Sequence, residues 1–165
     1  MTSVSTLATP AGPFTVIAAD DAVLASGWTA DPGELLAVIH PSLRPSSLTE
    51  RADLGEFSRA VAAYHDGDLK AIDAVPVRQA SGEFLMNAWD VLRTVPAGEP
   101  LTYTEYAALA GRPAAVRAAA SACARNATAL FIPCHRVLRT DGTLGGFRWG
   151  LGVKRWLLDH EAPDI

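Results

Sequence analysis

Two helices in close succession are predicted by residues 102–125, which read TYTEYAALAGRPAAVRAAASACAR. Thr102 and Glu105 have the spacing of a capping box, in which the two side chains satisfy free backbone N–H groups at the start of a helix. Gly111 ends the first helix, and a proline opens the second, which we predict over residues 113–125. Two short helices joined by a few residues that include glycine have the layout of a helix-turn-helix.

Alanine fills most of the second predicted helix and leaves little bulk around Arg117. Small side chains let a helix approach another surface closely. Two interpretations stay open from the residues alone. The helix packs tightly on its neighbours, or it enters a DNA groove with Arg117 as a single long cationic side chain.

Charge is unevenly divided along the 165 residues, whose formal net charge is −4. Residues 1–111 carry six Lys and Arg against fourteen Asp and Glu, which gives −8, and residues 112–165 carry eight against four, which gives +4. A cationic C-terminal part is typical of nucleic-acid contact, although a chance asymmetry of the surface would look the same.

The first eighty residues predict a small mixed lobe. We predict strands over 15–19 and 23–28, a helix that begins at Pro32 after an Asp31 cap, a helix over 54–64 and a further strand over 70–77. A polar connection follows near residues 77–81, and apolar residues at helical spacing begin at Phe84. We therefore expect the α+β class with two domains, an N-terminal α/β lobe over 1–80 and a mostly helical domain over 81–165.

Several classes of protein are disfavoured by composition. Hydrophobic residues make up 49% and charged residues 19%, a globular profile with no apolar run long enough for a membrane span. We find no signal peptide, and two cysteines are too few for a disulfide scaffold, so we expect a reducing, cytoplasmic location. His40 and His65 lack cysteine partners, and we expect no metal.

The chemistry is concentrated in residues 132–137, which read IPCHRV. A thiol has a reference pKa of about 8.5 and needs a base or a positive field to ionise at neutral pH. His135 and Arg136 follow Cys134 directly and offer either, and Glu161 could orient the base to complete a Cys–His–carboxylate relay. A small buried cysteine without chemistry is the alternative that spacing leaves open.

Three segments together resemble a known family. They are FLMNAWDVLRTVPAGEPLTYTEYAALAG at 84–111, the PCHRV string at 133–137 and GGFRWGLGVKRWLLDHE at 145–161. This half of the chain is similar to the O6-alkylguanine-DNA alkyltransferases, also called methylated-DNA–protein-cysteine methyltransferases. The resemblance implies a ribonuclease-H-like sheet in the N-terminal lobe, where the match holds only in outline, and a helix-turn-helix of winged-helix type in the C-terminal lobe.

The resemblance also implies roles for individual residues. Cys134 would accept the alkyl group, and His135 would deprotonate it through a water molecule. Glu161 would hold His135 in the required tautomer. Tyr103 would donate to the departing guanine.

Contact with DNA is implied in the same way. Arg117 matches the family's arginine finger, which fills the space left by a nucleotide flipped out of the duplex, while its helix enters the minor groove. The DNA-facing residues implied by the resemblance are Arg117, Ala115, Ala118, Thr102, Tyr103 and Asn126. Asn126 also matches the residue that ties the helix-turn-helix to the active-site segment.

A base pocket is implied at Val137, Phe147, Arg148 and Trp149. The family commonly has Tyr at the position of Phe147, so a hydroxyl group is lost here. Trp149 stands where the family often has Gly, and its indole is expected to disfavour large alkyl groups.

These observations predict DNA repair by irreversible, single-turnover transfer of an alkyl group from O6-alkylguanine to Cys134. The expected partner is double-stranded DNA with a flipped base, and the expected state is a monomer without a cofactor. Two alternatives remain, a non-catalytic lesion-binding protein of the alkyltransferase-like type and a thiol hydrolase that uses Cys134 and His135.

Overall fold

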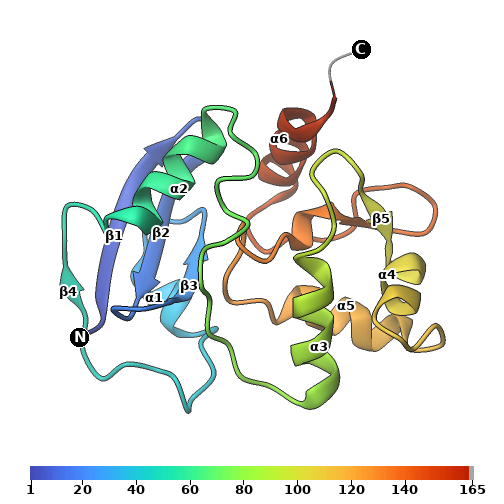
Figure 1. Cartoon of the computed structure of the whole chain (residues 1–165), viewed down its shortest axis with the longest axis horizontal. Helices are drawn as coiled ribbons and strands as arrows, with labels where there is room; N and C mark the ends of the chain where they lie inside the picture. The colour runs from blue at the N-terminus through green and yellow to red at the C-terminus, as the bar shows by residue number, and fades with distance from the viewer. Residues whose placement is uncertain (164–165) are drawn as a thin grey trace. The chain divides into compact units, whose positions relative to one another are not determined.

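The computed structural model describes residues 1–163 and divides into two compact units. The first contains Met1–Ala80 and Ala127–Phe131, and the second contains Ser81–Asn126 and the chain from Ile132 onward. Strands dominate the first unit and helices the second (Figure 1), so the predicted α+β class is confirmed. Among the described residues, no helix combines the length and apolarity that crossing a membrane requires.

A four-stranded sheet forms the centre of the first unit, in the order β3-β2-β1-β4. Its strands are β1 (Ser3–Thr9), β2 (Gly12–Ala18), β3 (Val23–Gly27) and β4 (Thr49–Glu50). The first three run antiparallel, and β4 runs parallel to β1. Gly12 has a φ of 116°, a backbone conformation that favours glycine, and it closes the β1–β2 hairpin.

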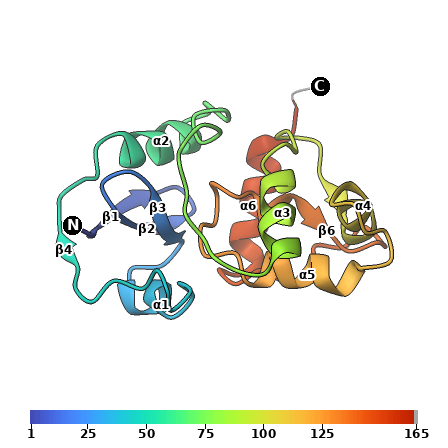
Figure 2. The same ribbon diagram turned by 60° about the horizontal axis from the view of Figure 1, so that its bottom comes forward.

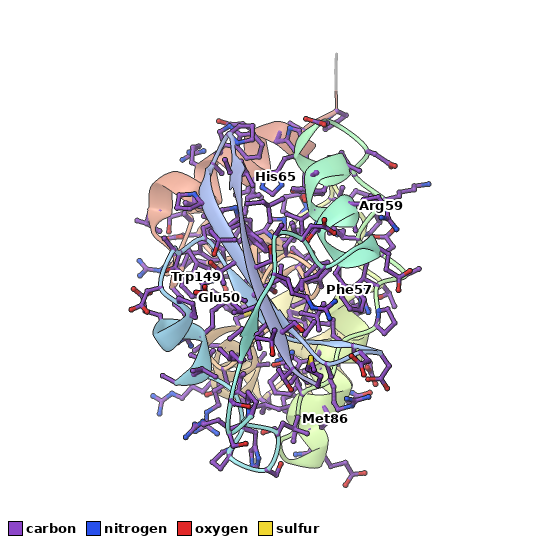
Figure 3. The ribbon with its side chains drawn as sticks, turned by 90° about the vertical axis from the view of Figure 1, so that its left-hand side faces the viewer. Glu50, Phe57, Arg59, His65, Met86 and Trp149 are labelled. Atoms are coloured by element: carbon purple, nitrogen blue, oxygen red, sulfur yellow. The ribbon has the colours of Figure 1, made fainter. Side chains whose placement is uncertain are left out.

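Helices α1 (Pro32–Leu36) and α2 (Glu56–His65) lie on opposite sides of this sheet (Figures 2 and 3). Figure 3 shows Phe57 and His65 of α2 turned toward the strands and Arg59 turned away from them. The two inward side chains are buried and Arg59 is exposed. The amphipathic spacing of the helix therefore places its apolar face on the sheet.

The predicted elements of this unit have mixed outcomes. The strands predicted at 15–19 and 23–28 and the helix that begins at Pro32 are confirmed, and the Asp31 carboxylate accepts from the Gly33 N–H at 2.9 Å. The strand predicted at 70–77 is wrong. Turns occupy most of that stretch, and only Val77 makes a bridge, to Val23.

Strand β1 was not predicted, because alternating serine and threonine hide its pattern. Ser3 and Ser5 are buried, and the Ser5 hydroxyl donates to the carbonyl of Ala52 at 3.0 Å. A serine whose hydroxyl group is hydrogen-bonded can occupy a buried strand position, although the pattern of apolar residues does not mark that position as buried.

Residues 127–131 return from the second half of the sequence to complete the first unit. The Ser26 N–H donates to the carbonyl of Ala127 at 2.9 Å, and the Ser26 hydroxyl donates to that of Ala129 at 2.8 Å. The Ala127 N–H donates to the side-chain oxygen of Gln79 at 2.8 Å. The first unit therefore consists of two separate stretches of the chain, and a single domain boundary near residue 80 does not separate the two units.

Up to residue 163, the second unit contains four α-helices and a two-stranded parallel sheet. In chain order these are α3 (Glu83–Leu92), β5 (Leu101–Thr102), α4 (Tyr103–Leu109), α5 (Val116–Ala124), the 3-10 helix η1 (Cys134–Arg136), β6 (Val137–Leu138) and α6 (Leu151–Glu161). Strand β5 pairs with β6, and the helices gather around this pair (Figures 1 and 2).

Helix α5 packs closely on α3 through its small residues. Ala119 and Ala122 are fully buried, and the indole N–H of Trp89 donates to the carbonyl of Ala122 at 2.8 Å. The close-packing interpretation of the alanines is therefore confirmed for this face. Ala115 and Ala118 are only partly covered and Arg117 is exposed.

The capping box at the start of α4 is confirmed, with both of its hydrogen bonds present between Thr102 and Glu105. The predicted start of the next helix is wrong. Helix α5 begins at Val116 because residues 113–115 form a turn, in which the Ala115 N–H donates to the carbonyl of Arg112 at 2.9 Å. Ala115 has a ψ of 46°, outside the helical range.

Candidate active site

Cys134 is the first residue of η1, directly after Pro133. Its backbone N–H donates to the carbonyl of Ile132 at 2.8 Å, and the Arg136 N–H donates to that of Pro133 at 3.0 Å. Strand β6 begins at the next residue and fixes the end of the segment by pairing with β5. Cys134 is only 8% exposed, so its thiol is shielded from solvent.

A buried network joins η1 to the end of α6. His135 Nε2 lies 2.8 Å from one carboxylate oxygen of Glu161. Arg136 donates to both oxygens of the same carboxylate, from Nε and from one terminal nitrogen, at 2.9 Å each. Its other terminal nitrogen donates to the carbonyl of Val95 at 2.7 Å. The predicted pairing of His135 with Glu161 is thus present, with Arg136 as a second partner.

The protonation states follow from this arrangement. Burial lowers the pKa of His135 more than the neighbouring Glu161 raises it, so the imidazole is neutral near pH 7. Burial alone would raise the pKa of Glu161, but His135 and Arg136 together hold it well below its usual value. Neutral His135 therefore donates its Nε2–H to an ionised carboxylate.

The other ring nitrogen of His135 is in a different position. Nδ1 is buried, and it is the one buried side-chain nitrogen or oxygen among residues 1–163 without a hydrogen-bond partner. Because Nε2 carries the proton, Nδ1 presents a lone pair. A buried lone pair in this state is suited to accept a proton.

The electrostatics around Cys134 act in opposite directions. Burial raises the pKa of the thiol, while a hydrogen bond from Asn126 and the positive charges of Lys154 and Arg148 lower it. Burial prevails, so the resting side chain is a thiol rather than a thiolate. Chemistry at this sulfur requires a base.

Asn126 is held beside this thiol by a second contact. Its side-chain N–H donates to the carbonyl of Ile132 at 2.8 Å, and only 4% of the residue is exposed. The amide thus fixes the residues before Cys134 to the end of α5.

Lys154 was not predicted as part of the site. It is 1% exposed, and its ammonium group donates to the carbonyls of Val137 at 2.8 Å and Leu144 at 2.5 Å. The sequence did hold a signal, because Lys154 falls on the same face of its helix as buried Leu157 and Glu161. A lysine on a buried face is rare unless its charge has partners.

Tyr103 opens α4 and is partly buried. Burial raises its pKa to about 12. Gly145, with a φ of 73°, comes so close that an added Cβ would lie 3.6 Å from the tyrosine hydroxyl. The phenol therefore stays protonated near pH 7. The neighbouring Gly145 has no side chain that could cover its hydroxyl group.

The remaining predicted residues differ in their exposure to solvent. Arg117 projects from α5 into solvent, and among the described residues it makes no hydrogen bond or ion pair. Thr102 is partly exposed at the start of α4. Among the predicted pocket residues, Val137 is buried, and Phe147 and Trp149 are partly covered. Arg148 donates to the carbonyl of Ala124 at the end of α5.

Known proteins are similar to this chain in both sequence and fold. Residues 83–163 match a family described as the DNA-binding domain of 6-O-methylguanine DNA methyltransferase. A methylated-DNA–protein-cysteine methyltransferase of Salmonella typhimurium is 35% identical over 159 residues, which covers 94% of this chain and 93% of that protein. The chain belongs to the methylated-DNA–protein-cysteine methyltransferase family.

Three further known proteins are similar to this methyltransferase family member. The bifunctional transcriptional activator/DNA repair enzyme Ada of Escherichia coli is 54% identical over 81 residues, and the chain matches 23% of its length. The chain likewise spans 36% of the Ada regulatory protein of Salmonella typhimurium. The crystal structure of Mycobacterium tuberculosis OGT in complex with DNA aligns with a TM-score of 0.79 at 26% identity, over 98% of this chain and 95% of that one.

Proposed function

We propose that this chain repairs DNA by moving an alkyl group from O6 of guanine to the sulfur of Cys134, once per molecule. The observation that carries the proposal is the different bonding of the two ring nitrogens of His135. Its Nε2 is bound to the Glu161 carboxylate at 2.8 Å, and its Nδ1 has no partner among the described residues. The base that a buried thiol requires is therefore next to Cys134 in the chain.

The proposed transfer conserves atoms and electrons. Cys134 gives its proton to Nδ1 of His135 through a bridging water, and the thiolate attacks the alkyl carbon attached to O6. The S–C bond forms as the C–O6 bond breaks, and the electron pair of that bond stays on guanine. Guanine then takes up one proton. The products are an S-alkylcysteine, which no step reverses, and unmodified guanine.

Tyr103 is proposed to donate toward the departing guanine. A phenol with a pKa of about 12 is fully protonated near pH 7 and therefore offers an O–H where negative charge develops. Lys154 and Arg148 are proposed to stabilise the thiolate through their charges, because both lower the pKa of Cys134.

Double-stranded DNA that contains O6-alkylguanine is the proposed partner. The target oxygen lies inside the duplex, so the nucleotide must be flipped out before Cys134 can reach it. Arg117 is proposed to fill the vacated space from α5, whose exposed face carries the small residues Ala115 and Ala118. We propose that the protein acts as a monomer in the cytoplasm, where a reducing environment keeps the acceptor thiol free.

The experiment is incubation of the protein with a duplex that contains one O6-methylguanine, followed by intact mass measurement and peptide mapping. The expected result is a gain of one methyl group per protein, located on Cys134, and loss of the lesion in equal amount. A protein that binds the duplex without a gain in mass would be a lesion-binding protein. Repeated turnover on an ester with no dependence on DNA would identify a thiol hydrolase.

The DNA-binding mode is tested with Arg117→Ala. We expect this substitution to slow repair in duplex DNA far more than transfer from free O6-methylguanine, because only the duplex requires flipping. Arg125→Ala removes another exposed arginine near the end of the same helix and is the matched control. Equal losses on the duplex and the free base would contradict the role of Arg117.

A further inference from the structure

The second unit contains a cavity of about 560 Å³ that the proposed reaction does not use. Its walls come from the loop before β5, the end of β6, the turn at 142–144 and one face of α6. The loop before β5 runs beside α6 in both Figure 1 and Figure 2. The volume lies within the range of small-molecule sites, roughly 300–1,000 Å³.

Most of the side chains that line this cavity are apolar, and one of them is cationic. Leu138, Leu144 and Leu158 line it, together with Arg155. Arg155 is exposed, and within residues 1–163 its guanidinium group forms neither an ion pair nor a hydrogen bond. A guanidinium has five N–H donors in a planar fork that matches a carboxylate.

The cavity is separate from the active site, although Glu161 contributes to both. The Glu161 side chain is 1% exposed and is occupied by His135 and Arg136. Its backbone carbonyl faces Gly98 on the other side, where an added Cβ would lie 2.9 Å away. A molecule in the cavity would therefore meet the backbone end of Glu161 and not its carboxylate.

We propose that this cavity binds a small molecule with an apolar body and a single carboxylate, with the carboxylate on Arg155 and the body against the three leucines. Charge complementarity selects the anion, because Arg155 is the one basic residue in the lining. The leucine walls select an apolar body and disfavour a sugar-phosphate chain, whose charges would be buried without partners.

The test compares two matched ligands, octanoate and 1-octanol, by titration of the isotope-labelled full chain and NMR detection of the backbone amides. Octanoate is expected to shift the amides of Leu144 and Leu158 in a saturable way. It is expected to bind about threefold to tenfold more tightly than 1-octanol, the range for a charge-assisted contact at a partly exposed site.

Three variants sharpen the test. Arg155→Gln is expected to reduce the affinity for octanoate to that for 1-octanol. Ala162→Trp fills the cavity from an exposed lining position and is expected to abolish binding of both ligands. Arg59→Gln removes an exposed arginine of the first unit and is expected to change neither.

Equal affinities of the native protein for octanoate and 1-octanol would overturn the proposal. So would octanoate shifts that lie away from the cavity or survive Ala162→Trp in a folded variant. If Arg155→Gln weakens binding to duplex DNA and leaves octanoate binding unchanged, Arg155 is a DNA contact and the proposal is wrong.

Discussion

Each unit of the molecule buries one histidine, and the two are bonded in opposite ways. His65, in the first unit, has Nδ1 at 2.7 Å from the carbonyl of Val61 and Nε2 at 3.3 Å from the indole N–H of Trp28. His135, in the second unit, has Nε2 on the Glu161 carboxylate and leaves Nδ1 without a protein partner.

The partners decide which nitrogen carries the proton. A carbonyl accepts only and an indole N–H donates only, so His65 is protonated on Nδ1 and both of its nitrogens are satisfied by neutral groups. A carboxylate accepts only, so His135 is protonated on Nε2. Burial alone therefore does not distinguish the two histidines. The charge of the partner and the unused lone pair do.

The largest expected effect separates the two histidines by activity. His135→Gln is expected to slow methyl transfer from an O6-methylguanine duplex by about a hundredfold to ten-thousandfold, the usual contribution of a general base. His65→Gln is the matched control and is expected to leave the rate unchanged, because His65 contacts no reacting group. Single-turnover kinetics on both folded variants measure the difference. A similar loss in both would remove the distinction.

The second effect is on stability and concerns the charged partner. Glu161→Gln leaves Arg136 buried with a neutral partner, and we expect a loss of about 3–5 kcal/mol in the free energy of unfolding. Urea denaturation measures it. Asp21→Asn breaks the exposed pair between Asp21 and Arg78 and is expected to change stability very little. Comparable losses in the two variants would show that the Glu161 network is no stronger than a surface pair.

The same network makes stability depend on pH. The pKa values of His135 and Glu161 are both lowered by folding, so their stabilisation is complete above the ordinary values of 6.5 and 4.5 and is lost as pH falls below them. We expect the free energy of unfolding to decrease between pH 8 and pH 5 in the native protein. The decrease should be smaller in His135→Gln, and equal slopes in the two proteins would contradict the low pKa of His135.

A third, smaller effect tests the positive charge of Lys154 near the Cys134 thiol. Lys154→Met removes a positive charge near Cys134 and leaves the carbonyls of Val137 and Leu144 without their donor. We expect the pKa of Cys134 to rise and stability to fall by about 1–3 kcal/mol. The pH dependence of alkylation by iodoacetamide measures the first change. Arg155→Met alters the next residue, which is exposed, and is expected to shift neither quantity.

The smallest effect returns to the structural histidine. Trp28→Phe keeps an aromatic ring against Phe14, whose centroid lies 4.9 Å away, but removes the N–H that His65 Nε2 accepts. We expect a stability loss of about 0.5–1.5 kcal/mol, the net value of one hydrogen bond. Methyl transfer should be unchanged. A marked slowing would mean that the first unit affects the chemistry.

Local signals in the sequence predicted the elements that local physics controls. The capping box at Thr102 and the Asp31 cap each depend on residues two or three positions apart, and both are present. The start of α5 was missed because proline fits a turn as well as a first helical position. Strand β1 was missed because its buried serines depend on partners elsewhere in the chain.

The site divides in the same way. The pairing of His135 with Glu161 followed from chemistry and from the family resemblance. The hydrogen bond from Arg136 to the carbonyl of Val95 did not, because it joins residues 41 positions apart and forms only in the folded chain. The helical spacing indicated that Lys154 is buried, but not which groups it contacts, since its partners lie on β6 and in the loop that follows.

The most direct test of the account is the tautomeric state of the two histidines, measured by nitrogen-15 NMR of labelled protein at neutral pH. We predict a neutral His135 protonated on Nε2 and a neutral His65 protonated on Nδ1. This result would place a free lone pair at His135 Nδ1, ready to take the Cys134 proton. A His135 protonated on Nδ1, or on both nitrogens, would contradict the account, because that ring could not act as the base.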